Sequence, residues 1–318
     1  MRSYRVAASA GFCFGVRRAV EQAFSLPPGR KYVSFGQLIH NKAIVQQLSL
    51  QGIATVESID DIPDGVTVIL RTHGVGRDRI DALTARGLAI LDLTCPFVKK
   101  IHSIVEREQN LGRKIIVIGD SLHPEVFGIA KWCENPLIFK DSAAVAAYFL
   151  TSSAEITDYS VVAQTTIERK VWEDCIKLLK KYCTNVKIFD TICNATIERQ
   201  NEAADMAETC PVMVVIGDRK SANTGKLANV CEAQGATVYK IEDASELPKS
   251  FPDSITIGIT AGASTPDWII KEVKKVMSEE MNIPQGGENF AEMLDASFKT
   301  LYTGEKVVGI VTDRKSVV

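Results

Sequence analysis

Short runs of aliphatic and β-branched residues alternate along the chain with stretches in which apolar residues recur every three or four positions. The runs have the length and composition of buried strands and lie at residues 66–70, 114–119, 160–164, 186–190, 212–217 and 255–260. The intervening stretches have helical periodicity. Strands that alternate with helices predict an α/β fold built on parallel sheets.

The first helical stretch follows Cys13 in the segment "GFCFGVRRAV". Its apolar positions are spaced i, i+3, i+4, i+7 and i+8 and comprise Val16, Ala19, Val20, Ala23 and Phe24. This stripe predicts an amphipathic helix that begins directly after the cysteine.

The chain contains an internal repeat built around three cysteines. Cys95 in "LDLTCPFVKKI" and Cys193 in "FDTICNATIER" both follow a strand and an Asp, and both precede a helix. In each case a glycine lies 24 residues further on, in the matching segments "VIGDSLHP" and "VIGDRKSAN". Cys13 fits the same plan, with a glycine 23 residues later in "SFGQLIHN".

Each unit of the repeat also carries two polar loops at strand ends. The first set is the fourth residue after the repeated glycine and comprises His40, His123 and Ser221. The second set ends a later strand and comprises His73, Thr165 with Thr166, and Ser264. Because ligands gather at the carboxyl ends of parallel strands, packing about an approximate threefold axis would bring the cysteines together inside a ring of polar loops.

These observations predict three pseudo-repeated parallel-sheet α/β lobes in a trefoil. The predicted division of the 318 residues is 1–93, 94–190, 191–278 and a tail at 279–318.

Composition excludes several classes of protein. A formal net charge of -2 gives no basic surplus for nucleic acid, and 46% hydrophobic content excludes a disordered chain. Eight cysteines without a C-x-x-C pair favour a reducing cytosol, so we expect a cytoplasmic protein. No apolar run reaches the roughly 18 residues that a membrane span requires, and a glycine-interrupted start followed by Arg17 and Arg18 argues against a signal peptide.

Three convergent thiolates suggest a metal centre. A structural zinc usually takes four protein ligands, whereas a 4Fe-4S cluster with three cysteine ligands keeps one iron open to act on a substrate. A helix that starts at each cysteine favours the thiolate form. The alternatives are three core cysteines, or zinc in a non-catalytic metal- and phosphate-binding protein. The other cysteines have no counterpart in the repeat and are expected in the core or on the surface: Cys133, Cys175, Cys183, Cys210 and Cys231.

Three of the four histidines occupy matched strand ends, where a histidine beside free backbone N–H groups suits an anion such as phosphate. The third unit offers neutral donors in "SANTGK" and "GAST" instead, so we expect a diphosphate pocket. His102 lies in mid-helix and is expected at the surface. Glu125 in "SLHPEVFG" is either a solvated charge at a helix start or, beside a metal-bound substrate, a proton donor. Nucleotide binding has little support, since no P-loop is present.

The assembled motifs resemble the LytB family of 4-hydroxy-3-methylbut-2-enyl diphosphate reductases over residues 4 to 278. The resemblance is carried by "GFCFGVRRAV", "GQLIHN", "RTHGV", "LDLTCPFVKKIH", "GDSLHPEVFGI", "AQTT", "SANTGKL" and "AGASTPDW". It implies a trefoil around one central 4Fe-4S cluster. It also implies the last step of the non-mevalonate pathway, a two-electron, two-proton reductive dehydroxylation of the (E)-allylic diphosphate to isopentenyl and dimethylallyl diphosphate.

The resemblance also implies roles for individual residues. Cys13, Cys95 and Cys193 would hold the cluster, Glu125 would supply the proton, and Thr165, or less well Thr166, would orient the substrate hydroxyl. His123 would help the proton relay. The diphosphate would be held by His40, His73, His123, Ser221, Asn223 and Ser264. Ala222 stands where some members have a second serine, so only its backbone N–H could contribute. Ferredoxin or flavodoxin is the implied electron donor.

The tail beyond about residue 278 falls outside this resemblance. Its segment "ENFAEMLDASFKTLYTGEKVVGIVT" resembles the lead-in and first strand of an S1-type RNA-binding barrel. Because one strand cannot close a five-stranded barrel, we expect a truncated linker that does not bind RNA.

Overall fold

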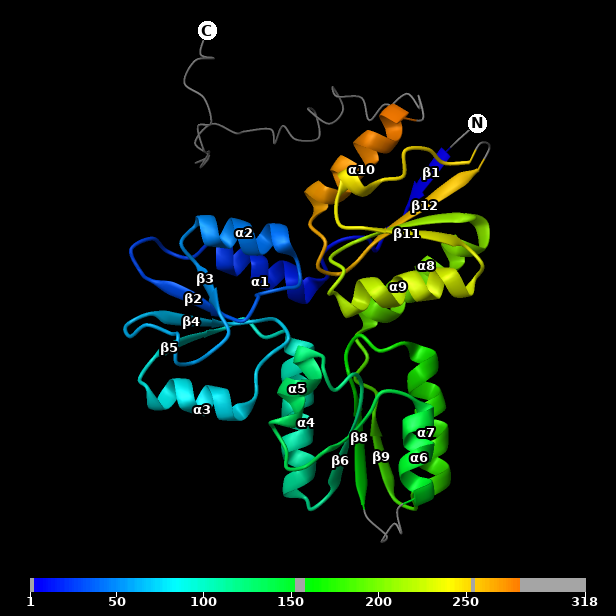
Figure 1. The fold of residues 1–318 in the computed structure, drawn as a ribbon. Helices are drawn as coiled ribbons and strands as arrows, with labels where there is room; N and C mark the ends of the chain where they lie inside the picture. The colour runs from blue at the N-terminus through cyan, green and yellow to red at the C-terminus, as the bar shows by residue number, and fades with distance from the viewer. Residues whose placement is uncertain (1–2, 152–157, 253–254, 281–318) are drawn as a thin grey trace, which may run out of the picture.

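Three four-stranded sheets, in which every strand pair is parallel, form the framework of the protein (Figure 1). The computed structural model describes residues 3–151, 158–252 and 255–280. One sheet has the order β3 (Ala54–Val56), β2 (Tyr32–Phe35), β4 (Thr67–Leu70), β5 (Ala89–Asp92). The second has the order β7 (Leu137–Phe139), β6 (Lys114–Ile118), β8 (Tyr159–Ala163), β9 (Val186–Phe189). The third has the order β1 (Ser3–Val6), β12 (Thr256–Ala261), β10 (Val212–Ile216), β11 (Thr237–Ile241).

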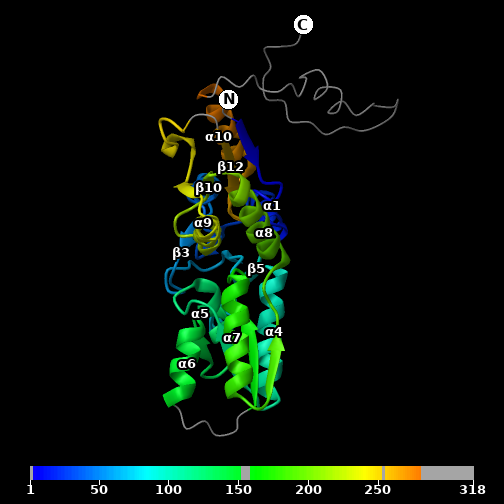
Figure 2. The same cartoon turned by 90° about the vertical axis from the view of Figure 1, so that its right-hand side faces the viewer.

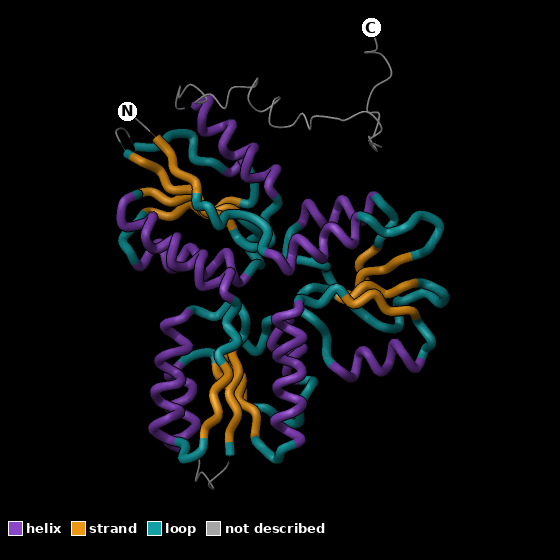
Figure 3. Tube along the Cα trace, turned by 180° about the vertical axis from the view of Figure 1, so that it is seen from behind, coloured by secondary structure: helices purple, strands orange, loops and turns teal. Residues whose placement is uncertain are grey.

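The apolar runs identified in the sequence are the inner strands β4, β6, β8, β10 and β12 and the edge strand β9, whereas the inner strand β2 was not among them. Every residue of β8 and β10 is buried, as expected of strands covered by helices on both faces. The three lobes surround a common centre (Figure 3), which confirms the predicted trefoil of parallel-sheet α/β units.

The first strand departs from the predicted division of the chain. We placed residues 1–93 in one lobe, but β1 pairs with β12 of the third lobe, with Ser3 opposite Thr256 and Val6 opposite Ile259. The reason is that β12 would otherwise be an unpaired edge, with hydrogen-bonding groups exposed on one side. With β1 included, each lobe has the same plan, and β1, β5 and β9 are equivalent edge strands.

Three equivalent helices follow these edge strands and begin just after the three cysteines: α1 (Phe14–Phe24), α4 (Pro96–Asn110) and α8 (Asn194–Thr209). The predicted stripe of α1 is largely buried, through Ala19, Val20 and Ala23. A second set follows the loops with the first polar residues: α2 (Lys42–Leu50), α5 (Pro124–Ala130) and α9 (Ala222–Ala233). In Figure 2, α1, α4 and α8 lie along one side of the flattened molecule, and α5 and α9 lie along the other.

The remaining helices complete the cover of the sheets: α3 (Arg77–Ala85), α6 (Ser142–Thr151), α7 (Arg169–Tyr182), α10 (Asp267–Glu280) and the 3₁₀ turn Ala244–Glu246. Each lobe has apolar cores of its own, such as the cluster of Ile116, Val161 and Trp172 in the second lobe. Full burial of one large apolar side chain contributes roughly 1.5–3 kcal/mol, so these cores hold the lobes rigid around the centre.

Two expectations from the sequence concern membrane-spanning segments and the C-terminal tail. Within the described residues, no helix is both long and apolar enough to cross a membrane. The S1-like segment of the predicted tail lies outside the described residues, which end at position 280.

Candidate functional site

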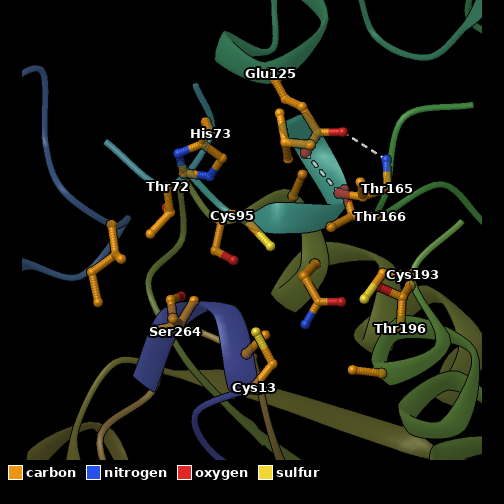
Figure 4. A pocket seen from close by; sticks show the side chains of 18 of the residues that line it. Cys13, Thr72, His73, Cys95, Glu125, Thr165, Thr166, Cys193, Thr196 and Ser264 are labelled. Atoms are coloured by element: carbon orange, nitrogen blue, oxygen red, sulfur yellow. Dashed lines mark hydrogen bonds between the residues drawn. The ribbon is translucent and has the colours of Figure 1, made fainter. Parts of the chain in front are cut away.

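The carboxyl ends of the three sheets surround a central cavity of about 760 Å³, including the part that is open to solvent. All the residues that the sequence analysis proposed as cluster ligands, proton donors or substrate-binding residues line this cavity: Cys13, His40, His73, Cys95, His123, Glu125, Thr165, Thr166, Cys193, Ser221, Ala222, Asn223 and Ser264. Figure 4 shows cysteines from all three helices facing the space beneath His73 and Glu125.

The three cysteines are held by the same backbone contact in each lobe. Each is the residue immediately before its helix, and its N–H donates to a carbonyl in the loop after the neighbouring strand. The three contacts are Cys13 to Ala263 at 3.3 Å, Cys95 to Thr72 at 3.0 Å and Cys193 to Thr165 at 3.0 Å. The threefold repeat therefore fixes the cysteines and the second set of polar loops relative to one another.

The thiol environment suits ligation by a cationic group. Burial raises the pKa of Cys95 to about 11, and the neighbouring Cys13 and Cys193 add to the rise. Burial likewise raises the pKa of Cys193, while the N–H groups at the start of α8 oppose the rise. Three thiolates cannot be stable here unless positive charge compensates them, which a metal centre would provide.

The histidines and the cysteines of the cavity have different surroundings. Among the described residues, ligand atoms of His40, His73 and His123 lie within 4.8 Å of one another. A Cβ on Gly15 would lie 2.6 Å from Cys95 Sγ, so this glycine leaves the room that the sulfur needs.

Arg199 lines the cavity beside the cysteines and was missed by the sequence analysis. Its guanidinium donates to the Gly11 carbonyl at 2.6 Å and to the Ala195 carbonyl at 3.1 Å. Burial lowers its pKa, whereas the charges of Cys13 and Cys193 raise it, which places a buried cation next to two of the thiols. The helical spacing could have revealed that Arg199 is buried, since Thr196, Arg199 and Ala203 lie on one buried face of α8.

Glu125 and Thr165 form a buried pair across two elements of the second lobe. Thr165 N–H donates to Glu125 Oε1 at 2.6 Å, and the Thr165 hydroxyl donates to Oε2 at 2.7 Å (Figure 4). Burial raises the pKa of Glu125, and the two bonds from Thr165 and the charge of Lys226 only partly oppose this. A carboxyl group whose pKa is raised by burial retains its proton more readily at neutral pH.

His123 is oriented by the helix that it precedes. Its Nδ1 accepts the N–H of Glu125 at 3.2 Å, so in the neutral ring the proton must lie on Nε2. Burial lowers the pKa of His123 to about 4, which keeps the ring neutral. Nε2–H is therefore a donor, which suits an anion better than a metal ion.

His40 and His73 complete the histidine trio. The ring centroids of His40 and His73 lie 4.6 Å apart, and that of His123 lies 6.1 and 5.5 Å from them. Burial lowers the pKa of both, and for His73 the shift is large. Both ring nitrogens of His40 and Nδ1 of His73 are buried without a hydrogen-bond partner.

The third lobe contributes neutral polar groups to the same cavity. Both side-chain polar atoms of Asn223 and the hydroxyl of Ser264 are buried without partners, while Ser221 accepts the N–H of Thr224 at 3.4 Å. Ala222 is the first residue of α9, so only its backbone N–H faces this end of the helix. Buried polar groups without partners are rare in proteins, and such a concentration indicates a polar ligand.

His102 is not the surface residue that we expected. It is 5% exposed, stacks on Trp132 with ring centroids 4.7 Å apart, and packs against Gly74 of the "RTHG" loop. Its position in α4 follows Val98 by four residues, which places it on the buried face. The five cysteines outside the repeat are free thiols, and of these Cys175, Cys210 and Cys231 are buried.

Comparison with known proteins agrees with this geometry. The family model described as LytB protein matches residues 5–278. A relative from Thermoanaerobacter sp. (strain X514), named 4-hydroxy-3-methylbut-2-enyl diphosphate reductase, is 39% identical over 276 residues, or 85% of this chain and 94% of the relative. A relative of the same name from Clostridium acetobutylicum is 36% identical over 318 residues, or 97% of this chain but 49% of the relative.

Two solved structures are similar to this one. The first, described as the reductase of (E)-4-hydroxy-3-methyl-but-2-enyl diphosphate and the terminal enzyme of the non-mevalonate pathway, has a TM-score of 0.61 and 33% identity, and covers 88% of this chain and 100% of that one. The second is a reductase from Plasmodium falciparum with a TM-score of 0.82 and 23% identity, covering 92% of this chain and 98% of that one, and it supports the fold alone.

Proposed function

The chain belongs to the LytB protein family, and from that premise we propose how its residues carry out the family's reaction. It is a 4-hydroxy-3-methylbut-2-enyl diphosphate reductase of the non-mevalonate pathway, as its relatives are named. The reaction removes the allylic hydroxyl as water, consumes two electrons and two protons, and yields isopentenyl and dimethylallyl diphosphate. The observation that carries the proposal is one cavity that joins three cysteines, a buried carboxyl group and a cluster of unpartnered polar groups.

Glu125 is the proton donor in this proposal. Its burial raises the pKa, so the carboxyl group can hold a proton at neutral pH and release it as negative charge develops on the substrate. The hydroxyl of Thr165, 2.7 Å from Glu125 Oε2, lies where it can orient the substrate hydroxyl and pass the proton to it. Thr166, which accepts from Gln164 Nε2 at 3.2 Å, is the weaker candidate for this role.

The diphosphate binds at the histidine trio and at the start of α9. Nε2–H of His123 and one N–H from each of the neutral rings of His40 and His73 donate from one side. The other side is formed by Ser221, Asn223, Ser264 and the N–H of Ala222. A helix N-terminus favours negative charge, so the start of the 12-residue helix α9 assists these neutral donors. His123 contacts both Glu125 and the diphosphate, and thus joins the phosphate site to the proton relay.

Membership of the family implies an iron–sulfur cluster, and we propose one 4Fe-4S cluster held by Cys13, Cys95 and Cys193. The donor set fits, because three soft thiols, one from each lobe, line one cavity, and burial raises the pKa of Cys95 and Cys193 there. When bound, such a cluster supplies electrons one at a time and one iron without a protein ligand as a Lewis acid. Arg199 would stabilise the negative charge of the ligated thiolates.

Ferredoxin or flavodoxin is the proposed electron donor. Support comes from Phe14, which is 66% exposed directly beside Cys13, since exposed aromatic side chains are typical of protein interfaces. Phe14→Ser should raise the KM for the carrier protein several-fold and leave the rate with dithionite unchanged. An equal loss with both reductants would contradict a docking role.

Two further proposals concern the tail of the chain and its location in the cell. We propose that residues 279–318 correspond to the start of an S1-type region, because the match to the Clostridium acetobutylicum relative covers 97% of this chain and only half of that protein. We also propose a cytoplasmic location, which eight free thiols favour.

The test is anaerobic purification and cluster reconstitution, followed by turnover of the diphosphate with dithionite as reductant. We expect iron–sulfur absorbance, an EPR signal on reduction, and consumption of substrate with release of both products. A colourless protein that contains zinc and remains inactive after reconstitution would support a non-catalytic metal- and phosphate-binding protein instead. Cys13→Ser should lower the iron content as well as the rate.

A further inference from the structure

The groups that surround the proposed diphosphate site are neutral. The pKa values of all three histidines lie below their ordinary value because of burial, and the other donors are hydroxyl, amide and backbone groups. Among the described residues, Arg199 is the only arginine or lysine in the lining of this cavity, and it donates to the Gly11 and Ala195 carbonyls beside the cysteines. The charges of Lys220 and Lys226 act on His40 and His123 from outside the lining. A multiply charged anion in a partly dry cavity requires a counter-charge close by.

Arg71 places a cation directly behind the histidines. It follows β4 and precedes His73 by two residues. Its Nε donates to the Gly74 carbonyl at 3.5 Å, and its Nη1 lies 2.6 Å from where a Cβ on Gly36 would be. Gly36 has a φ of +75° and begins the loop that carries His40. The guanidinium therefore touches both histidine loops of the first lobe.

Glu57 compensates this guanidinium only at a distance. Within the described part of the chain, Arg71 makes no ion pair within 4.0 Å. Glu57 lines the same small cavity behind the loops, and its charge raises the pKa of Arg71, whereas burial lowers it. A guanidinium stays charged in proteins, so its partial burial without a contacting carboxylate is unfavourable. That cost is offset when an anion binds on the far side of the histidine rings.

We propose that Arg71 is a positioning residue for the diphosphate, which supplies the counter-charge and fixes the loops of His40 and His73. This inference rests on the proposed function and adds to it a residue that does not touch the substrate. The charge of Arg71 acts on all three histidines, which places it within electrostatic reach of the whole trio.

The test compares three variants of the cluster-loaded protein by calorimetric titration with inorganic pyrophosphate and by steady-state kinetics. Arg71→Gln should weaken pyrophosphate binding about tenfold or more and raise the KM by a similar factor, with kcat within about twofold. Arg71→Lys, which keeps the charge, should recover most of the affinity. Arg79→Gln is the matched control, because Arg79 is exposed and lines the same small cavity.

A second measurement, the pKa values of the histidines by NMR, separates the loss of the Arg71 charge from a loss of folding. The chain has four histidines, so ring-labelled protein gives few NMR signals. In Arg71→Gln the pKa of His73 should rise because a nearby positive charge is lost, while its burial and its neighbours His40 and His123 stay the same. His102 responds to Asp92 and Lys99 instead and should not move.

The outcomes distinguish this inference from the proposed function. Wild-type pyrophosphate affinity in Arg71→Gln, or an unchanged pKa of His73, would overturn the role of Arg71 while the enzyme stays active. A loss in Arg71→Lys as large as that in Arg71→Gln would overturn the charge argument as well. A wild-type protein that neither binds pyrophosphate nor reduces the substrate would instead overturn the proposed function.

Discussion

Two buried glutamates in the second lobe have opposite electrostatic surroundings. Glu108, on α4, has a fully buried side chain that contacts Arg107 at 2.8 Å, Lys187 at 3.0 Å and Ser160 at 3.0 Å. Burial alone would raise its pKa, but the hydrogen bonds from Lys187, Arg107 and Ser160 outweigh burial and hold the pKa low. Glu125 is 2% exposed, and among the described residues Thr165 alone donates hydrogen bonds to its carboxylate, so burial prevails and raises its pKa.

Both side chains are almost inaccessible to solvent, but Glu108 lies near the surface beneath its cationic partners and Glu125 lies deep in the protein, so the difference comes from the partners and from the depth of burial together. A carboxylate with several cationic donors contributes to stability and stays ionised, whereas one with few donors can exchange a proton near neutral pH. Glu108 therefore connects α4 to β8 and β9, and Glu125 is suited to chemistry.

Replacing Glu125 with Gln should have the largest effect. The variant keeps the shape, and its amide oxygen can still accept the N–H of Thr165, while its NH2 group donates to the Thr165 hydroxyl where Oε2 accepted from it. Because the amide cannot deliver a proton, kcat should fall by about 10²–10⁴-fold. Pyrophosphate affinity and iron content, measured on the same sample, should stay close to those of the wild type. Near-normal turnover would show that Glu125 is not the proton donor.

Replacing Glu108 with Gln should affect stability and leave kcat unchanged. Removal of the Glu108 charge leaves Arg113, which is 13% exposed, with the half-exposed Asp158 as its remaining carboxylate partner, and we expect a loss of about 2–4 kcal/mol in the free energy of unfolding. Denaturant titration measures the loss. Asp158→Asn breaks the more exposed contact of Arg113 and should cost no more than about 1 kcal/mol. Equal losses of stability in Glu108→Gln and Asp158→Asn would show that the buried contact contributes no more than the exposed one.

The pH dependence of stability should have opposite signs at the two sites. The pKa of Glu108 in the folded protein lies below its ordinary value of 4.5, so its contribution is present above pH 4.5 and is lost as pH falls through the folded pKa. The pKa of Glu125 lies above 4.5, so the wild type loses stability relative to Glu125→Gln as pH rises from 4.5. Unfolding curves of both variants against wild type from pH 3 to 7 test this.

The smallest effect should come from Lys226, whose charge lowers the pKa of Glu125. In Lys226→Met the pKa of Glu125 should rise, and the pH at which activity falls should move upward by less than about one unit. Lys226→Arg keeps the charge and should leave the profile in place. A downward shift in the methionine variant would contradict the electrostatic coupling.

The spacing of the cysteines predicted the centre of the molecule well. Three equal units about an axis require their equivalent loops to meet, so the repeat placed Cys13, Cys95 and Cys193 in one cavity without knowledge of the contacts. The roles of the residues followed only from the family resemblance, because geometry alone does not distinguish a ligand from a bystander.

What the sequence did not reveal depends on contacts between distant segments. The partner of β1 lies some 250 residues away, and no local pattern indicates which sheet an edge strand will join. Arg199 and His102 are polar residues on buried helical faces, where residue type favours exposure and periodicity favours burial. In both cases periodicity was the better guide.

The pairing of β1 with β12 has a consequence for the order of biosynthesis. A ribosome adds roughly 5–20 residues per second, so about 12 to 50 s separate the emergence of β1 from that of its partner strand. The first and second sheets can form from local segments in that time. The third cannot, and Cys13 gains its contact with the Ala263 carbonyl only when the sheet closes. A cluster held by all three cysteines would therefore assemble only after β12 has emerged, and a bulky addition to the first strand should interfere with maturation before it affects turnover.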